Sequence, residues 1–321
     1  MNDATRASLL LAAVIPAERQ SNIAPLTTGE FHRLLAALQA PEEDMASLAG
    51  QDATIVLERL TTAGWDGERL GKLLARAANL DLAVERWTQI ELQVVGYLDR
   101  DYPSRLREQL GDAAPPLLFV AGSTQLLARG GLAVVGSRNT DEAALRFTAR
   151  LASLCAEQGV AVISGGARGV DQTAMLAALD VNGYVLGMLA DSLAREAISE
   201  KYRVHLDRGH LALASSCSPE APFSVGNAMS RNKLIYVLSD AAFVVCSDAQ
   251  TGGTWNGAVE NLKKKWTPLL VRRDDLAPRG NELLIGRGGV PFESNELDST
   301  PDIRSWFARP VDSSGLSLFP D

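Results

Sequence analysis

Two short glycine turns, each carrying an arginine, hold the residues of this sequence best suited to binding chemistry. Gly136-Ser137-Arg138 follows the apolar run Leu132–Val135, and Ser164-Gly165-Gly166-Ala167-Arg168-Gly169 follows Val160–Ile163. Glycine lets backbone N–H groups come close to a ligand, and a helix that begins at such a turn favours an anion. A guanidinium adds planar donors that match a phosphate. The turns predict phosphate binding, while tight strand-to-helix connections alone also explain the glycines.

Two further segments carry polar groups toward the same kind of site. Thr251-Gly252-Gly253-Thr254 is a third glycine-rich loop, and Ser230-Arg231-Asn232-Lys233 offers two cations and an amide. We expect the basic segment to open the helix that precedes a strand at 242–247. Cations in the first turn of a helix oppose its dipole, which favours a ligand-facing role over a solvated helix end.

The residues give less support to the hypothesis that this protein is an enzyme. The histidines have no metal-ligand spacing, and no Gly-Lys-Ser/Thr sequence closes either glycine turn as a nucleotide-binding P-loop would require. Asp171, Asp191 and Glu260 are candidate acids or bases, although Asp171 also suits the first turn of a helix. We expect no catalytic set, no metal and no cofactor.

Regular alternation of strands and helices must position these loops. Continuous apolar runs of this kind are typical of parallel strands covered on both faces, and helical segments fall between most of them. The sequence predicts an α/β fold with a doubly wound, mostly parallel, Rossmann-like sheet. In such folds ligands bind beyond the carboxyl ends of the strands, where the three glycine loops would converge. The strand candidates are 92–95, 117–120, 132–135, 160–164, 184–189, 211–215, 242–247 and 267–271.

Size and charge set further bounds. The chain has 321 residues and a net charge of −8, so a nucleic-acid site would have to be a local patch on an acidic body. We predict a helical N-terminal domain over 1–85, the extended Rossmann-like domain over 86–299 and a C-terminal tail over 300–321. Three cysteines without metal spacing, and apolar runs too short to span a bilayer, predict a cytoplasmic protein without a membrane segment.

The assembled motifs resemble the DprA/Smf family of DNA-processing proteins. The resemblance covers roughly residues 86–275 and rests on six pieces of sequence: Tyr102-Pro103 with Leu106, Pro115-Pro116-Leu117-Leu118-Phe119, Gly136-Ser137-Arg138, Ser164-Gly165-Gly166-Ala167-Arg168-Gly169-Val170-Asp171, Arg231-Asn232-Lys233 and Thr251-Gly252-Gly253-Thr254. It implies an extended Rossmann-like domain that binds single-stranded DNA, forms a homodimer and loads RecA, or serves another protein partner, in transformation or recombination. No catalytic turnover is implied.

The resemblance also assigns the binding residues. The expected DNA- and phosphate-binding set is Gly136, Ser137, Arg138, Ser164, Gly165, Gly166, Arg168, Gly169, Arg231, Asn232, Lys233, Thr251, Gly252, Gly253 and Thr254. The chain departs from the family pattern where an aromatic-proline pair usually precedes the Arg-Asn motif, because Asn227-Ala228-Met229-Ser230 stands there. We therefore expect a divergent branch.

A second resemblance, to nucleoside-monophosphate phosphoribohydrolases, supplies the alternatives. Met229, Arg231 and Lys233, with Gly252-Gly253-Thr254, are similar to the arginine and glycine-threonine region of those enzymes. Their glutamate two residues after the threonine is Asn256 here, which argues against N-glycosidic hydrolysis. A sensor of a nucleotide-derived signal in bacterial defence is the third reading.

Overall fold

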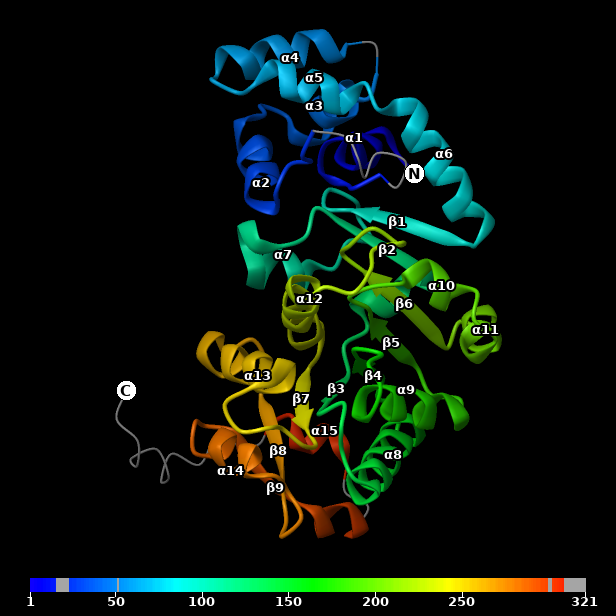
Figure 1. Cartoon of the computed structure of the whole chain (residues 1–321), viewed down its shortest axis with the longest axis vertical. Coiled ribbons are helices and arrows are strands. Elements are labelled where there is room, and N and C mark those ends of the chain that lie inside the picture. Colours follow the sequence, from blue (N-terminus) through cyan, green and yellow to red (C-terminus); the bar gives the residue numbers. More distant parts are fainter. Residues whose placement is uncertain (16–22, 51, 300–301, 309–321) are drawn as a thin grey trace.

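The computed structural model describes residues 1–15, 23–50, 52–299 and 302–308, and the described chain is built on one nine-stranded sheet (Figure 1). The strand order is β1-β2-β6-β5-β4-β3-β7-β8-β9. All neighbouring strands from β6 to β9 run parallel, while β2 pairs antiparallel with both β1 and β6. The strands are β1 Leu92–Gly96, β2 Leu117–Gly122, β3 Leu132–Val135, β4 Val162–Ser164, β5 Val185–Met188, β6 Leu211–Ser215, β7 Ala241–Val244, β8 Leu269–Arg273 and β9 Val290–Glu293. The predicted doubly wound α/β class is confirmed.

Strand β9 is the element of the sheet that the sequence analysis did not anticipate. It is four residues long and contains Pro291, which removes a backbone donor and is tolerated at a sheet edge. Its pairing with β8 brings Arg273 opposite Glu293, and the two side chains form an ion pair. Arg272 and Arg273 are the last two residues of β8.

Helices cover both faces of the sheet, as the alternation of elements predicts. The sheet helices are α7 Ser104–Leu110, α8 Glu142–Glu157, α9 Val170–Asp180, α10 Leu193–Ala197, α11 Glu200–Asp207, α12 Val225–Leu238, α13 Gly252–Lys264, α14 Arg279–Ile285 and α15 Ile303–Trp306. Short 3-10 turns occupy Gly111–Ala113, Thr124–Ala128 and Ser294–Ser299.

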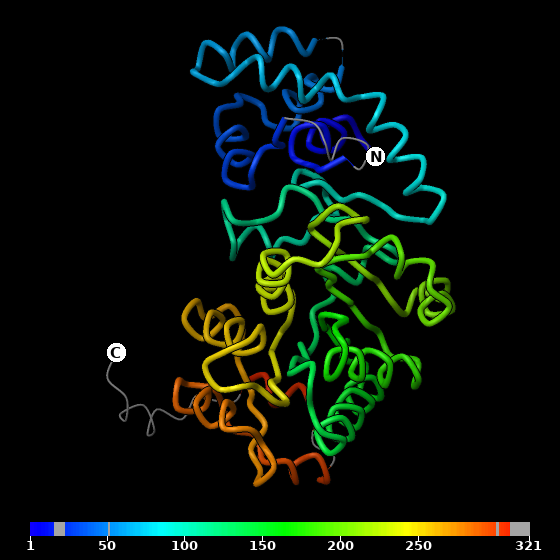
Figure 2. The backbone as a smooth tube through the Cα atoms, in the orientation of Figure 1, coloured from blue at the N-terminus to red at the C-terminus, as the bar shows by residue number. Residues whose placement is uncertain are grey.

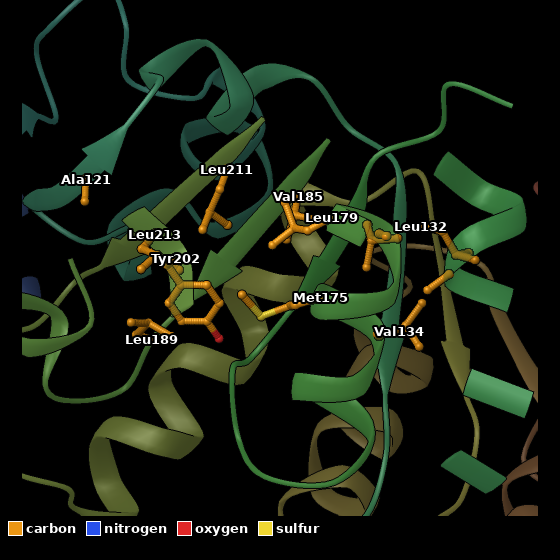
Figure 3. Close-up of a cluster of buried hydrophobic side chains, with 14 of the residues drawn as sticks. Ala121, Leu132, Val134, Met175, Leu179, Val185, Leu189, Tyr202, Leu211 and Leu213 are labelled. Carbon is orange, nitrogen blue, oxygen red and sulfur yellow. The ribbon is translucent and has the colours of Figure 1, made fainter. Parts of the chain in front are cut away.

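The two faces of the sheet carry separate apolar clusters because side chains alternate along each strand. Leu132 and Val134 of β3 join the cluster under α8 and α9, whereas Ala133 and Val135 join the one under α12 and α13. Figure 3 shows part of the first cluster, with Met175 and Leu179 of α9 among side chains of the neighbouring strands. Burial on both faces fixes the register of the strands, and hence the height at which each glycine turn leaves the sheet.

In the described chain six helices precede the sheet, and Figure 2 shows this blue-to-cyan segment at one end of the molecule. Phe31, Leu34 and Leu73 belong to their own cluster, while Leu9 and Trp87 are buried in a cluster with sheet residues. Helix α6 continues across residue 85, where the sequence analysis places its domain boundary. The partition into 1–85 and 86–299 stays a prediction. The helices are α1 Asp3–Ala12, α2 Thr28–Ala37, α3 Pro41–Leu48, α4 Ala53–Thr62, α5 Gly67–Leu74 and α6 Ala77–Gln89.

The C-terminal part of the described chain packs onto the body. Trp306 of α15 is 1% exposed, and its ring centroid lies 4.6 Å from that of Phe292 in β9. The rest of the predicted tail, residues 300–301 and 309–321, lies outside the described residues. None of the helices that the structure describes has both the length and the apolar surface needed to cross a lipid bilayer.

An ion pair ties the N-terminal helices together. Thr27 caps α2 with a capping box: its backbone N–H donates to Glu30 over 2.8 Å, and its hydroxyl accepts from the Glu30 N–H over 3.2 Å. Arg69 of α5 donates to the other Glu30 oxygen over 2.7 Å. The hydrogen bond from Arg69, helped by the Thr27 N–H, lowers the pKa of Glu30 to about 2.

We predict that Glu30→Gln lowers the free energy of unfolding at pH 7 by about 1 kcal/mol, because the partly exposed pair with Arg69 is lost while the cap can be retained. A carboxylate with a lowered pKa stabilises the fold above its unfolded pKa, so the advantage of the natural protein should shrink as the pH falls from about 4.5 toward about 2. Denaturant unfolding at a series of pH values measures this. Glu68→Gln is the control, because Glu68 pairs with Lys72 at the exposed surface. An equal effect of both substitutions at every pH would contradict the prediction.

Candidate functional site

A crevice opens where the strand order of the sheet reverses. Strands β3, β4, β5 and β6 are laid down in one direction from β3, and β7, β8 and β9 in the other. Such a switch point leaves a gap outside the carboxyl ends of the two central strands. A first cavity of about 520 Å³ lies there, between the turn after β3 and the loop after β7. Its lining includes Gly136, Ser137, Arg138, Asn139, Ala167, Asp171, Phe223, Arg231, Asn232, Tyr236, Asp248, Thr251, Gly252, Gly253, Thr254 and Asn256.

A second cavity, of about 420 Å³, adjoins the first along the carboxyl ends of β4 and β5. Arg138, Ala167, Phe223 and Arg231 line both cavities. The remaining walls come from the second glycine turn, from residues 189–191 after β5 and from α10 and α11: Gly165, Gly166, Arg168, Gln172, Leu189, Ala190, Asp191, Arg195, Glu196, Lys201 and Tyr202. The three glycine loops therefore converge at one rim, as predicted.

The two glycine turns are pressed against each other. A Cβ on Gly169, whose φ is +89°, would lie 2.7 Å from the Ser137 carbonyl oxygen and 2.8 Å from that of Arg138. A Cβ on Gly136 would lie 2.6 Å from Cγ2 of Val170. The backbone carbonyls beside Gly169 and the Val170 side chain beside Gly136 thus favour glycine at both positions whether or not a ligand is bound. The interpretation of the glycines as tight connections and their interpretation as a phosphate cradle are compatible.

Arg231 is buried between the cavities and pairs with Asp171. Its Nη1 donates to the Met188 carbonyl oxygen over 2.9 Å and lies 3.9 Å from Oδ2 of Asp171. Burial raises the pKa of Asp171, while Arg231 and the backbone amides of Ala167 and Gly136 oppose that shift. Burial likewise lowers the pKa of Arg231, and Asp171 opposes it. Asp171 therefore holds the turns and α12 together.

Helix α12 begins earlier than the sequence analysis expected, and that prediction was wrong. The helix starts at Val225, with the Ser224 hydroxyl accepting from the Asn227 N–H over 3.0 Å, so Arg231-Asn232-Lys233 lies in its interior. Ser224 is of a residue type that is favoured at this capping position. The argument from cations in a first turn does not apply.

The three residues of the basic segment point to different surroundings. Asn232 donates from Nδ2 to the Gly253 carbonyl oxygen over 3.1 Å, which links α12 to the third glycine loop. Lys233 donates from Nζ to the Ala113 carbonyl oxygen over 3.4 Å and lines neither of the two cavities. Only Arg231 and Asn232 of this segment therefore face the crevice.

Arg138 and Arg168 are the exposed cations of the glycine turns. Nη2 of Arg168 donates to Oδ1 of Asn139 over 3.3 Å, and Cζ of Arg138 lies 5.0 Å from the centroid of the Phe223 ring. Ser164, by contrast, is buried and donates from its hydroxyl to the Val134 carbonyl oxygen over 2.6 Å. The expected set thus divides into exposed groups that can meet a ligand and buried groups that hold the turns.

The sequence analysis missed the aromatic side of the crevice. Phe223 lines both cavities, and Arg195 and Lys201 extend the second one. An aromatic residue within the polar stretch between β6 and α12 was the available signal. Of the candidate acids, Asp171 lines the first cavity and Asp191 the second, whereas Glu260 lines neither. Within the described ranges, no three His, Cys, Asp or Glu side chains gather as metal ligands.

Fold and site together define a doubly wound α/β protein with a cation-bearing crevice at its switch point. The chain belongs to the family of DNA recombination-mediator protein A, whose model matches residues 93–291. The match contains both glycine turns, the basic segment and the third glycine loop.

Curated relatives agree over a shorter stretch. The chain is 33% identical to protein Smf of Escherichia coli strain K12 over 142 residues, which are 43% of this chain and 37% of that protein. It is 26% identical to the DNA processing protein DprA of Bacillus subtilis strain 168 over 141 residues, 43% of this chain and 47% of the relative. The matches span less than half the length of these relatives.

Solved structures show the same fold. DNA processing protein A of Streptococcus pneumoniae superposes with a TM-score of 0.62 at 18% identity, covering 87% of this chain and 99% of that one. The DNA processing protein A of Helicobacter pylori, described for its single-stranded DNA binding mode, gives a TM-score of 0.53 at 23% identity and covers 65% of this chain and 95% of its own.

We predict that Gly165→Ala destabilises the protein by about 3 kcal/mol, the cost of breaking a buried ion pair. A Cβ there would lie 1.5 Å from Nη1 of Arg231 and would force the guanidinium away from Asp171 and Met188. Denaturant unfolding measures the change. Gly71→Ala is the matched control, because Gly71 lies within α5 with open space around it and alanine favours a helix. A destabilisation by Gly165→Ala no larger than the change in this control would show that Gly165 is not needed to keep Arg231 paired with Asp171.

Proposed function

We propose that this chain binds single-stranded DNA in the crevice and acts as a recombination mediator without catalytic turnover. The observation that carries the proposal is the pair of exposed arginines, Arg138 and Arg168, at two glycine turns that meet over the paired cavities. A cationic groove that tracks the backbone is what strand binding requires. Family membership and the Helicobacter pylori relative's single-stranded DNA binding mode support it.

The distribution of charge suits a local site. The whole chain carries −8, so a strand would be repelled by most of the surface and attracted where arginines gather. The lining of the second cavity has five cationic side chains, Arg138, Arg168, Arg195, Lys201 and Arg231, against the acids Asp191 and Glu196. A phosphodiester backbone is the ligand that this imbalance favours.

The remaining parts of the proposal rest on the family resemblance. We expect a homodimer that delivers the strand to RecA or to another recombination protein. A cytoplasmic site of action fits the three cysteines, all of which are free thiols.

We predict that Arg168→Ala weakens binding of a single-stranded oligonucleotide by about tenfold at low salt, because one phosphate contact is lost. The slope of log affinity against log salt should flatten by about 0.7 for each contact removed. Arg138→Ala should act in the same direction. Fluorescence anisotropy across a salt series measures both quantities.

Arg146→Ala is the control, since Arg146 is an exposed arginine of α8 that lines neither cavity. It makes the same change of charge and should leave affinity and salt slope nearly unaltered. Lys233→Ala tests the remaining sequence-based assignment, and its contact with Ala113 predicts a smaller effect than Arg168→Ala. Equal losses for Arg146→Ala and Arg168→Ala would remove the crevice from the binding site.

A nucleotide ligand is the second candidate, favoured by the size of the first cavity, about 520 Å³. This volume is within the range of small-molecule sites. Asn256 lines the cavity in place of the phosphoribohydrolase glutamate, which supports binding without hydrolysis. Thermal-shift measurements with mononucleotides and oligonucleotides separate the readings, because only a ligand of the folded state raises stability. We expect the larger shift with oligonucleotides and no free base after incubation with nucleoside monophosphates.

A further inference from the structure

Phe223 is an exposed aromatic residue placed between the first and the second cavity. It is 50% exposed and belongs to none of the apolar clusters of the described chain. The residue lies in the loop between β6 and α12, two positions before the helix begins. With Arg138, Ala167 and Arg231 it lines both the first and the second cavity.

Half of the Phe223 side chain stays exposed and the residue lies outside the apolar clusters, so burial accounts for only part of its placement. Its one described ring partner is the Arg138 guanidinium, with Cζ 5.0 Å from the ring centroid. A guanidinium over an aromatic face makes a planar, cationic platform. Nucleobases stack on such platforms regardless of their sequence.

The two cavities differ in charge. This difference suits one of them to a nucleobase and the other to the phosphates of a DNA strand. Arg138 and Arg231 of the first cavity are balanced by Asp171 and Asp248, and its walls add amides and the Tyr236 ring. Beyond the shared Arg138 and Arg231, the second cavity adds three cations, Arg168, Arg195 and Lys201, against two acids, Asp191 and Glu196. A nearly neutral cavity lined by amide groups suits a nucleobase, whereas a cavity with more cations than acids suits phosphates.

We propose that Phe223, backed by Arg138, stacks on a nucleobase that enters the first cavity while the adjoining phosphates lie in the second. This inference rests on the proposed single-stranded DNA binding and names the residue that positions the strand within it. The segment Asn227-Ala228-Met229-Ser230, directly before Arg231, contains no aromatic residue. Phe223 supplies an aromatic ring at the crevice in its place. The stacking interaction is independent of charge, so its energy should not depend on salt.

The test compares Phe223→Ala and Phe223→Trp with the natural protein in anisotropy titrations against single-stranded DNA and against an abasic strand of equal length. Phe223→Ala should bind the natural strand about tenfold more weakly, the loss of one stacked base, with an unchanged salt slope. Phe223→Trp should keep or increase affinity. The abasic strand should bind all three proteins equally, because it offers no base to stack. Leu82→Ala, at a residue 53% exposed on α6, is the control for loss of an apolar side chain and should change nothing.

A second readout is an oligonucleotide with one fluorescent 2-aminopurine, whose emission should be quenched on binding to the natural protein and to Phe223→Trp but not to Phe223→Ala. Natural binding by Phe223→Ala, or a Phe223→Trp variant as weak as Phe223→Ala, would overturn the inference while leaving strand binding intact. Failure of the natural protein itself to bind any single strand would instead overturn the proposed function.

Discussion

The contact between the Asp171 carboxylate and the Arg231 guanidinium is the interaction on which the geometry of the crevice depends. It joins three parts of the chain that are far apart in sequence: the start of α9, the interior of α12 and, through the Met188 carbonyl oxygen, the end of β5. Both groups are buried, and burying two charges is favourable only when each has its partner in place. Loss of either partner would therefore leave the other charge buried and uncompensated.

Glycine makes that arrangement possible. Gly165 leaves the space that the guanidinium fills, and Gly169 lets the second turn rest on the carbonyl groups of the first. Buried and exposed cations are thus separated in space: Arg231 contacts Asp171 behind the turns, whereas Arg138 and Arg168 stay exposed at the crevice, where the proposed strand would meet them. A rigid cradle with preset cations loses less conformational entropy on binding than a flexible one.

The position of the cradle follows from the order of the strands. Because β3 lies between β4 and β7, the loops after β3 and β7 diverge and leave the first cavity between them. The additional strands β1 and β2 extend the sheet on the far side of β6 and provide the surface onto which α1 and α6 pack. The N-terminal helices are therefore attached to the edge of the sheet that is remote from the switch point.

The sequence alone determined the class of fold, the glycine loops and the rim at which they meet, because apolar periodicity and turn residues act locally. It also predicted Arg138 and Arg168 as phosphate-binding candidates, because each lies in a glycine turn that follows a recognisable strand. Tertiary structure decided which members of the set are buried: Ser164 and Arg231 look like surface ligands in sequence, but packing turns one toward Val134 and the other toward Asp171. It also decided how β9 pairs and that Phe223 stands beside Arg138, because both depend on contacts between segments distant in the chain. The start of α12, by contrast, follows from a local cap, Ser224, that the sequence analysis overlooked.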